Sequence, residues 1–319
     1  MRRFRARFLT ELSADAASPR ELEGSRVLTL RIALEIMLLP AAAVVAVFVF
    51  ARVIARRSGP RPGFRWPGRV AVGLAYVTAH GIRFGWPAAE QWTAIEAWQW
   101  LFFAVAAATV LAVIEAIPRR PFRPRWLLRA LLVLLLVLAS LHPFLRHSWQ
   151  RGEAVGWISG LVAACVVWWG LLECVAARRQ GRAAAPQLLI VAASTAVVLV
   201  LNGSQRLAEM AVILSAALAA ASLFGCRIRR RESIAGVSAV APILLAGLWL
   251  NGFFFLDLSR RTIALLALAP LAAEVRRIPL IAGLKPWRVG LINTLAVLGL
   301  SLAAVIPEIL DYQPDPYAY

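Results

Sequence analysis

Long apolar stretches alternate with short polar loops along almost the whole chain. A helix needs roughly 20 mostly apolar residues to cross the hydrocarbon core of a bilayer. The pattern predicts ten such segments, at 32–54, 69–86, 97–117, 126–146, 154–176, 186–202, 207–226, 234–256, 262–275 and 288–308. We therefore expect an all-α fold: a polytopic helical membrane protein with about ten transmembrane helices and short loops.

Two segments leave the number of crossings open. The uninterrupted apolar part of 69–86 runs only from Val70 to Thr78. The segment 32–54 contains Pro40, where a helix can bend and return to the same side. Nine crossings is the alternative to ten.

Arginines gather in every second loop, after the first, third, fifth, seventh and ninth apolar segments. They are Arg56, Arg57, Arg61 and Arg65; Arg119, Arg120, Arg123 and Arg125; Arg178, Arg179 and Arg182; Arg227, Arg229, Arg230 and Arg231; and Arg276, Arg277 and Arg288, with Lys285. The positive-inside rule makes these loops cytoplasmic and the C-terminal tail external. Ten crossings would also place the arginine-rich N-terminus outside, so its sidedness stays open.

The composition is typical of a membrane protein and limits the kinds of partner that we expect. Hydrophobic residues make up 61% of the chain and charged residues 16%, which excludes an ordinary soluble domain. A net charge of +18 on a soluble face would indicate nucleic-acid binding. Here the arginines lie between apolar runs, so we expect the lipid bilayer, anionic lipids at the arginine loops and possible membrane subunits as partners, and no nucleic acid.

The chain divides into three parts: a basic N-terminal arm at 1–26, a single helical transmembrane domain at 27–308, and an acidic and aromatic C-terminal tail at 309–319. Lys285 is the only lysine among 35 basic residues, a bias typical of a GC-rich bacterial genome. We therefore expect the protein in the cytoplasmic (inner) membrane of a bacterium.

Three glutamates lie near the ends of apolar segments: Glu115, Glu173 and Glu274. An acid inside a membrane segment is a candidate for a substrate site or an ion relay, because burying its charge is costly. Arg276 and Arg277 join that candidate site. The alternative is a set of ion pairs near the membrane surface, such as Glu274 with Arg277 and Glu115 with Arg119, that only fix the depth of each helix.

The ninth segment is short and contains Pro270. Short segments interrupted by proline line substrate sites in many transporters, because freed backbone groups face the substrate. The alternative is a simple kink, followed by an apolar patch at 278–284 that lies along the membrane surface.

The only histidines are His80, His142 and His147. Histidines on facing helices can hold a transition metal or haem. No HxxxH spacing or neighbouring cysteine supports such a site here, and solvated or helix-capping roles are the alternative.

Motifs for catalysis are missing from the sequence. It has no Gly-rich phosphate loop, HExxH or GxSxG, so the chain alone is not an ATP-driven pump, and no cofactor is implied. Two functions survive. The favoured one is a non-catalytic subunit, scaffold or assembly factor of a membrane complex. The alternative is a secondary transporter or channel-like protein for a small or lipidic solute, with its site near 262–277.

Overall fold

A computed structural model of the chain describes residues 31–57, 66–86, 96–116, 125–178, 184–227, 240–272 and 284–312. Over these ranges it contains helices and no strands, which confirms the all-α prediction for this part of the chain. The N-terminal arm at 1–26 and residues 313–319 of the tail lie outside the described residues.

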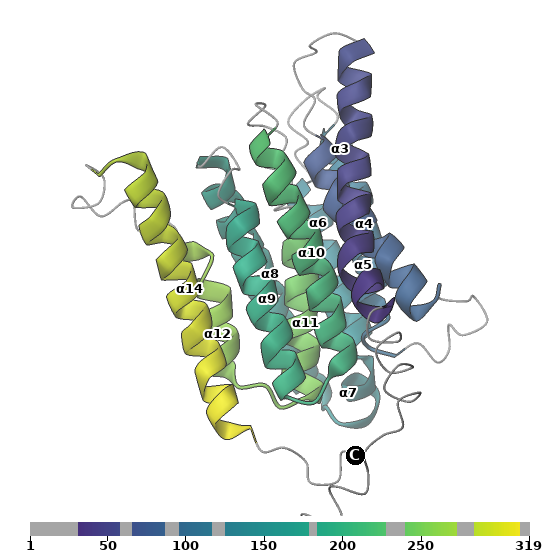
Figure 1. Ribbon diagram of the computed structural model, residues 1–319. Coiled ribbons are helices and arrows are strands. Elements are labelled where there is room, and N and C mark those ends of the chain that lie inside the picture. Colours follow the sequence, from purple (N-terminus) through teal and green to yellow (C-terminus); the bar gives the residue numbers. More distant parts are fainter. Residues whose placement is uncertain are drawn as a thin grey trace, which may run out of the picture.

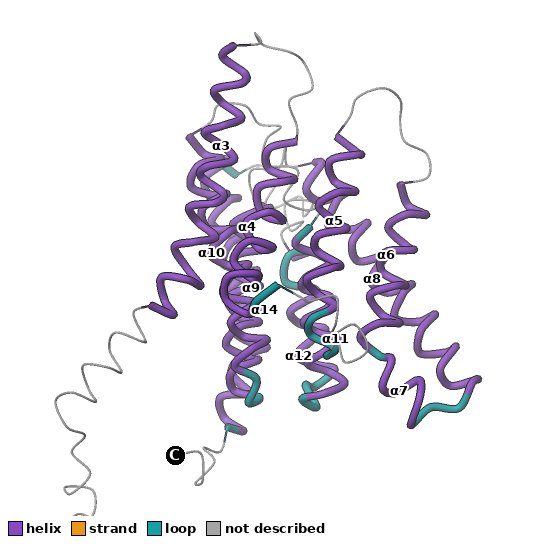
Figure 2. The backbone as a smooth tube through the Cα atoms, turned by 90° about the vertical axis from the view of Figure 1, so that its right-hand side faces the viewer, coloured by secondary structure: helices purple, strands orange, loops and turns teal. Residues whose placement is uncertain are grey.

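The helices form one bundle and run alternately up and down (Figures 1 and 2). They are η1 (Leu34–Leu38), α3 (Leu39–Arg57), α4 (Trp66–Phe84), α5 (Trp100–Ala116), α6 (Arg125–Ser140), α7 (His142–His147), α8 (Arg151–Arg178), α9 (Ala184–Leu201), α10 (Gln205–Arg227), α11 (Ala241–Phe255), α12 (Arg260–Leu268) and α14 (Pro286–Asp311). We call the end where α9 meets α10 the lower end, as in Figure 1, and the opposite end the upper end.

Several helices have the length and composition of membrane spans. Five described stretches are long and apolar enough to cross a membrane: Arg31–Val53, Arg151–Ala177, Ala184–Leu201, Gln205–Phe224 and Trp287–Asp311. Three further apolar helices are shorter: Val70–Phe84, Trp100–Glu115 and Ala241–Phe255.

Prolines explain where the structure departs from the predicted segments. The segment predicted at 126–146 is broken at Leu141 into α6 and the short α7, and Pro143 stands in the first turn of α7. Proline lacks an N–H, so it costs no hydrogen bond in the first turn of a helix, whereas in the interior it removes one. Of the segment predicted at 262–275, the structure describes the nine-residue α12, a turn at Ala269 and Pro270 and a 3-10 turn at 271–272, and residues 273–275 lie outside the described ranges.

Pro40 does not turn the chain back. The five residues of η1 form a π-helical turn, in which the Leu39 N–H donates to the Leu34 carbonyl, and α3 continues beyond Pro40 to Arg57. A wider turn is one of the ways in which a helix accommodates a proline. The bend and return at this residue, considered above for 32–54, is therefore wrong.

Helix α11 lies inside the bundle. Residues Ala241 to Gly252 are all buried, and α11 touches α5, α6, α8, α9 and α10. A helix that is apolar on every side must be surrounded by other helices or by lipid, and here other helices surround it. Two glycines allow close helix approach: a Cβ at Gly73 would lie 1.9 Å from Thr109 Oγ1, and one at Gly247 would lie 2.2 Å from Leu101 Cδ2.

The α9–α10 hairpin shapes the lower end. Gly203 has φ +82°, and the N–H groups of Gly203 and Ser204 donate to the carbonyls of Val200 and Leu199. This is the Schellman arrangement that ends a helix and satisfies its last carbonyls. As a result only residues 202–204 separate the end of α9 from the start of α10 at Gln205.

Candidate functional site

A buried charge cluster joins three helices near the upper end of the bundle. Arg129 of α6 donates from Nε and Nη2 to the two carboxylate oxygens of Glu115 on α5, at 2.9 and 2.5 Å. Its Nη1 lies 2.6 Å from Glu173 Oε2 on α8, an ion pair without normal hydrogen-bond geometry. The side chains of Arg129 and Glu115 are 3% and 7% exposed, so this pair interacts away from solvent, and that of Glu173 is 23% exposed at the edge of the cluster.

Two tryptophans enclose the Arg129 guanidinium. Its central carbon lies 4.9 Å from the ring centre of Trp126 and 5.0 Å from that of Trp169. Aromatic faces attract a cation and exclude water from it. With two carboxylates and one guanidinium, the cluster has a formal charge of −1, and the rings shield it.

This cluster contains two of the predicted site residues, Glu115 and Glu173, and a partner that sequence reasoning missed. Arg129 lies within the fourth apolar run, 14 positions from Glu115, so no local spacing indicates the pair. The other predicted residues, Glu274, Arg276 and Arg277, lie outside the described residues, as does Arg119. The arrangement holds the three helices together.

The three histidines have different surroundings. His80 of α4 is buried, and its ring lies 5.0 to 5.9 Å from the ring centres of four aromatic residues: Tyr76, Phe84, Trp98 and Phe102. His142 and His147 lie on α7 and are exposed. In the described part of the chain, no group of three or more His, Cys, Asp or Glu residues could hold a metal ion.

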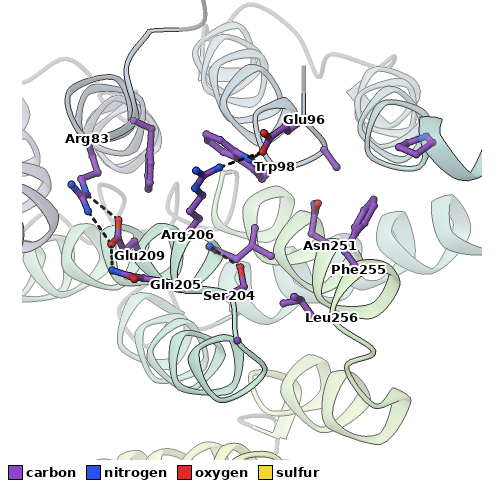
Figure 3. A pocket seen from close by; sticks show the side chains of 15 residues that line it. Arg83, Glu96, Trp98, Ser204, Gln205, Arg206, Glu209, Asn251, Phe255 and Leu256 are labelled. Carbon is purple, nitrogen blue, oxygen red and sulfur yellow. Dashed lines mark hydrogen bonds and ion pairs between the residues drawn. The ribbon is translucent and has the colours of Figure 1, made fainter. Parts of the chain in front are cut away.

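A pocket of about 880 Å³ opens at the lower end, between α4, the start of α5, the α9–α10 hairpin and α11 (Figure 3). On one side Arg83 donates from Nε and Nη2 to Glu209 at 2.9 and 3.0 Å, and Gln205 Nε2 donates to the same carboxylate at 3.0 Å. On another side Arg206 lies 3.4 Å from Glu96, which also accepts a hydrogen bond from the indole of Trp98. The rest of the lining is largely apolar and includes Phe84, Phe255 and Leu256.

A second polar contact ties α14 to the bundle at the lower end. The carboxylate of Glu308 accepts a hydrogen bond from Thr262 Oγ1 on α12 at 2.7 Å and one from Asn202 Nδ2 after α9 at 3.0 Å. Ser259 Oγ caps α12 by accepting from the Thr262 N–H. One carboxylate therefore fixes three elements relative to one another.

Helix α8 exposes small residues along its lower half. Gly152, Gly156 and Gly160 are spaced four apart, and a Cβ on any of them would meet nothing within 4 Å. Ser159, Ala163 and Ala164 are exposed beside them. A groove of about 450 Å³ runs along this face, lined by Glu153, Gly156, Trp157, Gly160 and Leu161. We call this surface, Gly152 to Ala164, the glycine face.

No protein-family model, curated protein or solved structure matches this chain. A function for the protein must therefore be inferred from the geometry of the charge cluster, the pocket and the glycine face.

Proposed function

We propose that the protein is a non-catalytic subunit, scaffold or assembly factor of a membrane complex, and that its partner is a transmembrane helix seated on the glycine face of α8. The observation that carries the proposal is the row of three glycines with open space above them. Each glycine in a helix interior costs roughly 0.5–1 kcal/mol relative to alanine. At Gly73 and Gly247 a neighbouring side chain of the same molecule leaves no room for a Cβ, which explains the glycine. At the three glycines of α8 no atom within 4 Å would meet a Cβ, so packing within this chain does not explain them.

Helix–helix association in bilayers supports this assignment. Lipid provides no hydrophobic driving force between helices, so close packing of small residues at every fourth position, and the van der Waals contact it permits, stabilises helix pairs. On α8 the large buried residues, Trp168, Trp169 and Leu172, lie toward the upper end against the bundle. In the lower half Ile158 and Val162 also pack on the core, and the side with the three glycines is left to a partner.

The proposal includes a location and an orientation. We place the bundle in the cytoplasmic membrane of a bacterium with ten crossings, its arginine loops in the cytoplasm and its C-terminus outside. The five long apolar stretches support membrane insertion. The positive-inside rule supports the orientation, with anionic lipid at the arginine loops.

Purification from native membranes in mild detergent tests the partner. The wild-type chain should co-purify with a membrane protein in constant stoichiometry, and the double variant Gly156→Leu/Gly160→Leu should lose it. Gly299→Leu on α14 is the matched control, since Gly299 also faces open space but has no glycine four residues away. A wild-type protein that always runs alone, or a partner retained by the double variant, would contradict the proposal.

The alternative function is a secondary transporter or channel-like protein with a site near 262–277. The observation that favours it is α12, a half-length helix that stops just before Ala269 and Pro270 beside α14. A transport path needs water access, so cysteines placed at Thr262 and Glu274 should react with a water-soluble maleimide, and Glu274→Gln should alter uptake of a transported solute. Resistance of both cysteines to labelling from either side would exclude this function.

A further inference from the structure

We propose that the pocket at the lower end binds an anionic amphiphile, meaning one phosphoryl or carboxylate head group attached to an apolar body. This site is separate from the glycine face of α8 and does not depend on the subunit proposal. The inference rests on a difference between two arginines in the same pocket, on the start of helix α10, and on the apolar part of the lining.

The two arginines differ in how well they are paired. Arg83 makes two hydrogen bonds of normal length to Glu209, a bidentate arrangement that neutralises both groups. Among the described residues, Arg206 has one longer charged contact, with Glu96 at 3.4 Å, and the two side chains are 64% and 60% exposed. An exposed ion pair of that kind contributes little to stability, so a ligand can replace it at small cost.

The surroundings of Arg206 favour that exchange. Its guanidinium carbon lies 5.5 Å from the ring centre of Trp98, which positions the group without consuming its N–H donors. Glu96 keeps the Trp98 indole as a hydrogen-bond donor when Arg206 leaves it. Arg206 is therefore a positioned cation with donors to offer an anion.

Helix α10 adds to the attraction for an anion. It begins at Gln205 in the pocket lining, and it is 23 residues long. The first N–H groups of a helix have no acceptor within that helix, and the macrodipole places positive charge there. Ser204 Oγ accepts from the Leu207 N–H at 3.4 Å, which leaves the N–H groups of Gln205 and Arg206 with no acceptor in the helix itself. These groups and Arg206 belong to the same turn.

The apolar part of the pocket lining indicates a ligand that has an apolar body in addition to its charged head group. Phe84, Trp98, Phe255 and Leu256 line the same pocket, and its 880 Å³ is within the range of small-molecule sites. An inorganic anion would leave this surface unused. The chemistry fits either a phospholipid from the adjoining leaflet or a soluble organic anion, which share the same head group and apolar part.

Isothermal titration of the purified full-length protein in a neutral detergent tests the site. The probes are hexyl phosphate as a soluble organic anion, dihexanoyl phosphatidylglycerol as a lipid, dihexanoyl phosphatidylcholine as a zwitterionic lipid, and inorganic phosphate. We expect saturable binding of one hexyl phosphate or one phosphatidylglycerol, and the tighter of the two identifies the source. Arg206→Gln should weaken it on the order of tenfold or more, as expected for a lost hydrogen bond to a charged group.

Two further variants make the result specific. Ala97→Trp fills the pocket without changing its charge and should abolish binding. Arg151→Gln removes an exposed arginine that does not line the pocket and should leave binding unchanged. Equal losses in Arg206→Gln and Arg151→Gln would overturn the site. So would phosphatidylcholine binding as tightly as phosphatidylglycerol, or inorganic phosphate binding as tightly as hexyl phosphate. If Ala97→Trp does not fold, the two arginine variants still decide the outcome.

Discussion

At the scale of single residues, Arg129 inside α6 is a buried charge whose stability depends on its partners. Arg129 is desolvated by Trp126 and Trp169 and sits between Glu115 and Glu173. A buried pair gains little relative to apolar residues of the same size, but loss of one partner leaves an uncompensated charge. Because the three groups come from α5, α6 and α8, they specify how these helices meet.

Removing the cation should therefore be far more damaging than removing all three charges. We expect Arg129→Gln to cost about 3–5 kcal/mol of stability, because Glu115 and Glu173 then lie together without a counter-charge. The triple variant Glu115→Gln/Arg129→Gln/Glu173→Gln should recover much of that loss. The measurement is the midpoint of unfolding in detergent, with the exposed Arg125→Gln as the control. A single variant as stable as the control would refute the structural role of the cluster.

The charge cluster also separates what a sequence can predict from what it cannot. Glu115 and Glu173 are recognisable because an acid at the end of an apolar run is unusual. Arg129 is as unusual, but its role depends on which helices are neighbours, and helix packing is not encoded in local spacing. The same holds for Arg83 and Glu209, which are 126 positions apart. Pairs of side chains on different helices can be predicted only when the fold shows which helices are neighbours.

At the scale of helices, α14 makes few polar contacts with the other helices that the structure describes. It packs mainly on α9 and α12, and much of its surface is exposed leucine and isoleucine. Glu308 supplies the lower anchor through Thr262 and Asn202. Pro307 precedes it and lacks an N–H, so the helix is weaker just where the carboxylate attaches.

Loss of that carboxylate should loosen one end of one helix and leave the bundle intact. We expect Glu308→Ala to cost about 1–3 kcal/mol locally, because Thr262 and Asn202 lose a charged acceptor. Hydrogen exchange should rise in the last two turns of α14 and the first turn of α12, with little change in α10. Asp311→Asn, an exposed neighbour, is the control. Uniform exchange across α14 in both variants would show that Glu308 is not an anchor.

The positions of most long helices were predicted well from the sequence. The points at which helices are interrupted were not. Apolar length identified α8, α9, α10 and α14 within a few residues, because burial or lipid contact demands such runs. A single run at 126–146 was expected, and Pro143 divides it. The glycine row of α8 is visible in the sequence, but only the structure shows that its three members have nothing above them.

At the scale of the whole molecule, the pocket and the charge cluster lie toward opposite ends of the described bundle. The pocket lies at the lower end, and the glycine face begins at Gly152 in the first turn of α8, which starts at that end (Figure 1). The charge cluster lies near the upper end, at the last turn of α5 and the first turns of α6. In the part of the chain that the structure describes, charged side chains pair helices with one another toward the upper end, and the pocket and the glycine face offer surfaces to other molecules toward the lower end.

The positive-inside rule, applied to the two ends of the bundle, predicts a labelling pattern for the membrane topology. In a variant with Cys165, Cys174 and Cys226 replaced by alanine, cysteines introduced at Ser204 and Asp311 should react with an impermeant maleimide in intact cells. Cysteines at Ala177 and Lys285 should react only after permeabilisation, since they lie at the upper end beside the arginine loops.

The same background decides between ten crossings and nine. In the structure α3 begins and α14 ends at the lower end, which requires an even number of passes between them (Figure 1). Arg31→Cys should therefore label from outside together with Asp311→Cys. If Arg31→Cys labels only after permeabilisation while Asp311→Cys labels in intact cells, the two ends lie on opposite sides, and one helix of the bundle, with the half-length α12 the first to examine, does not cross.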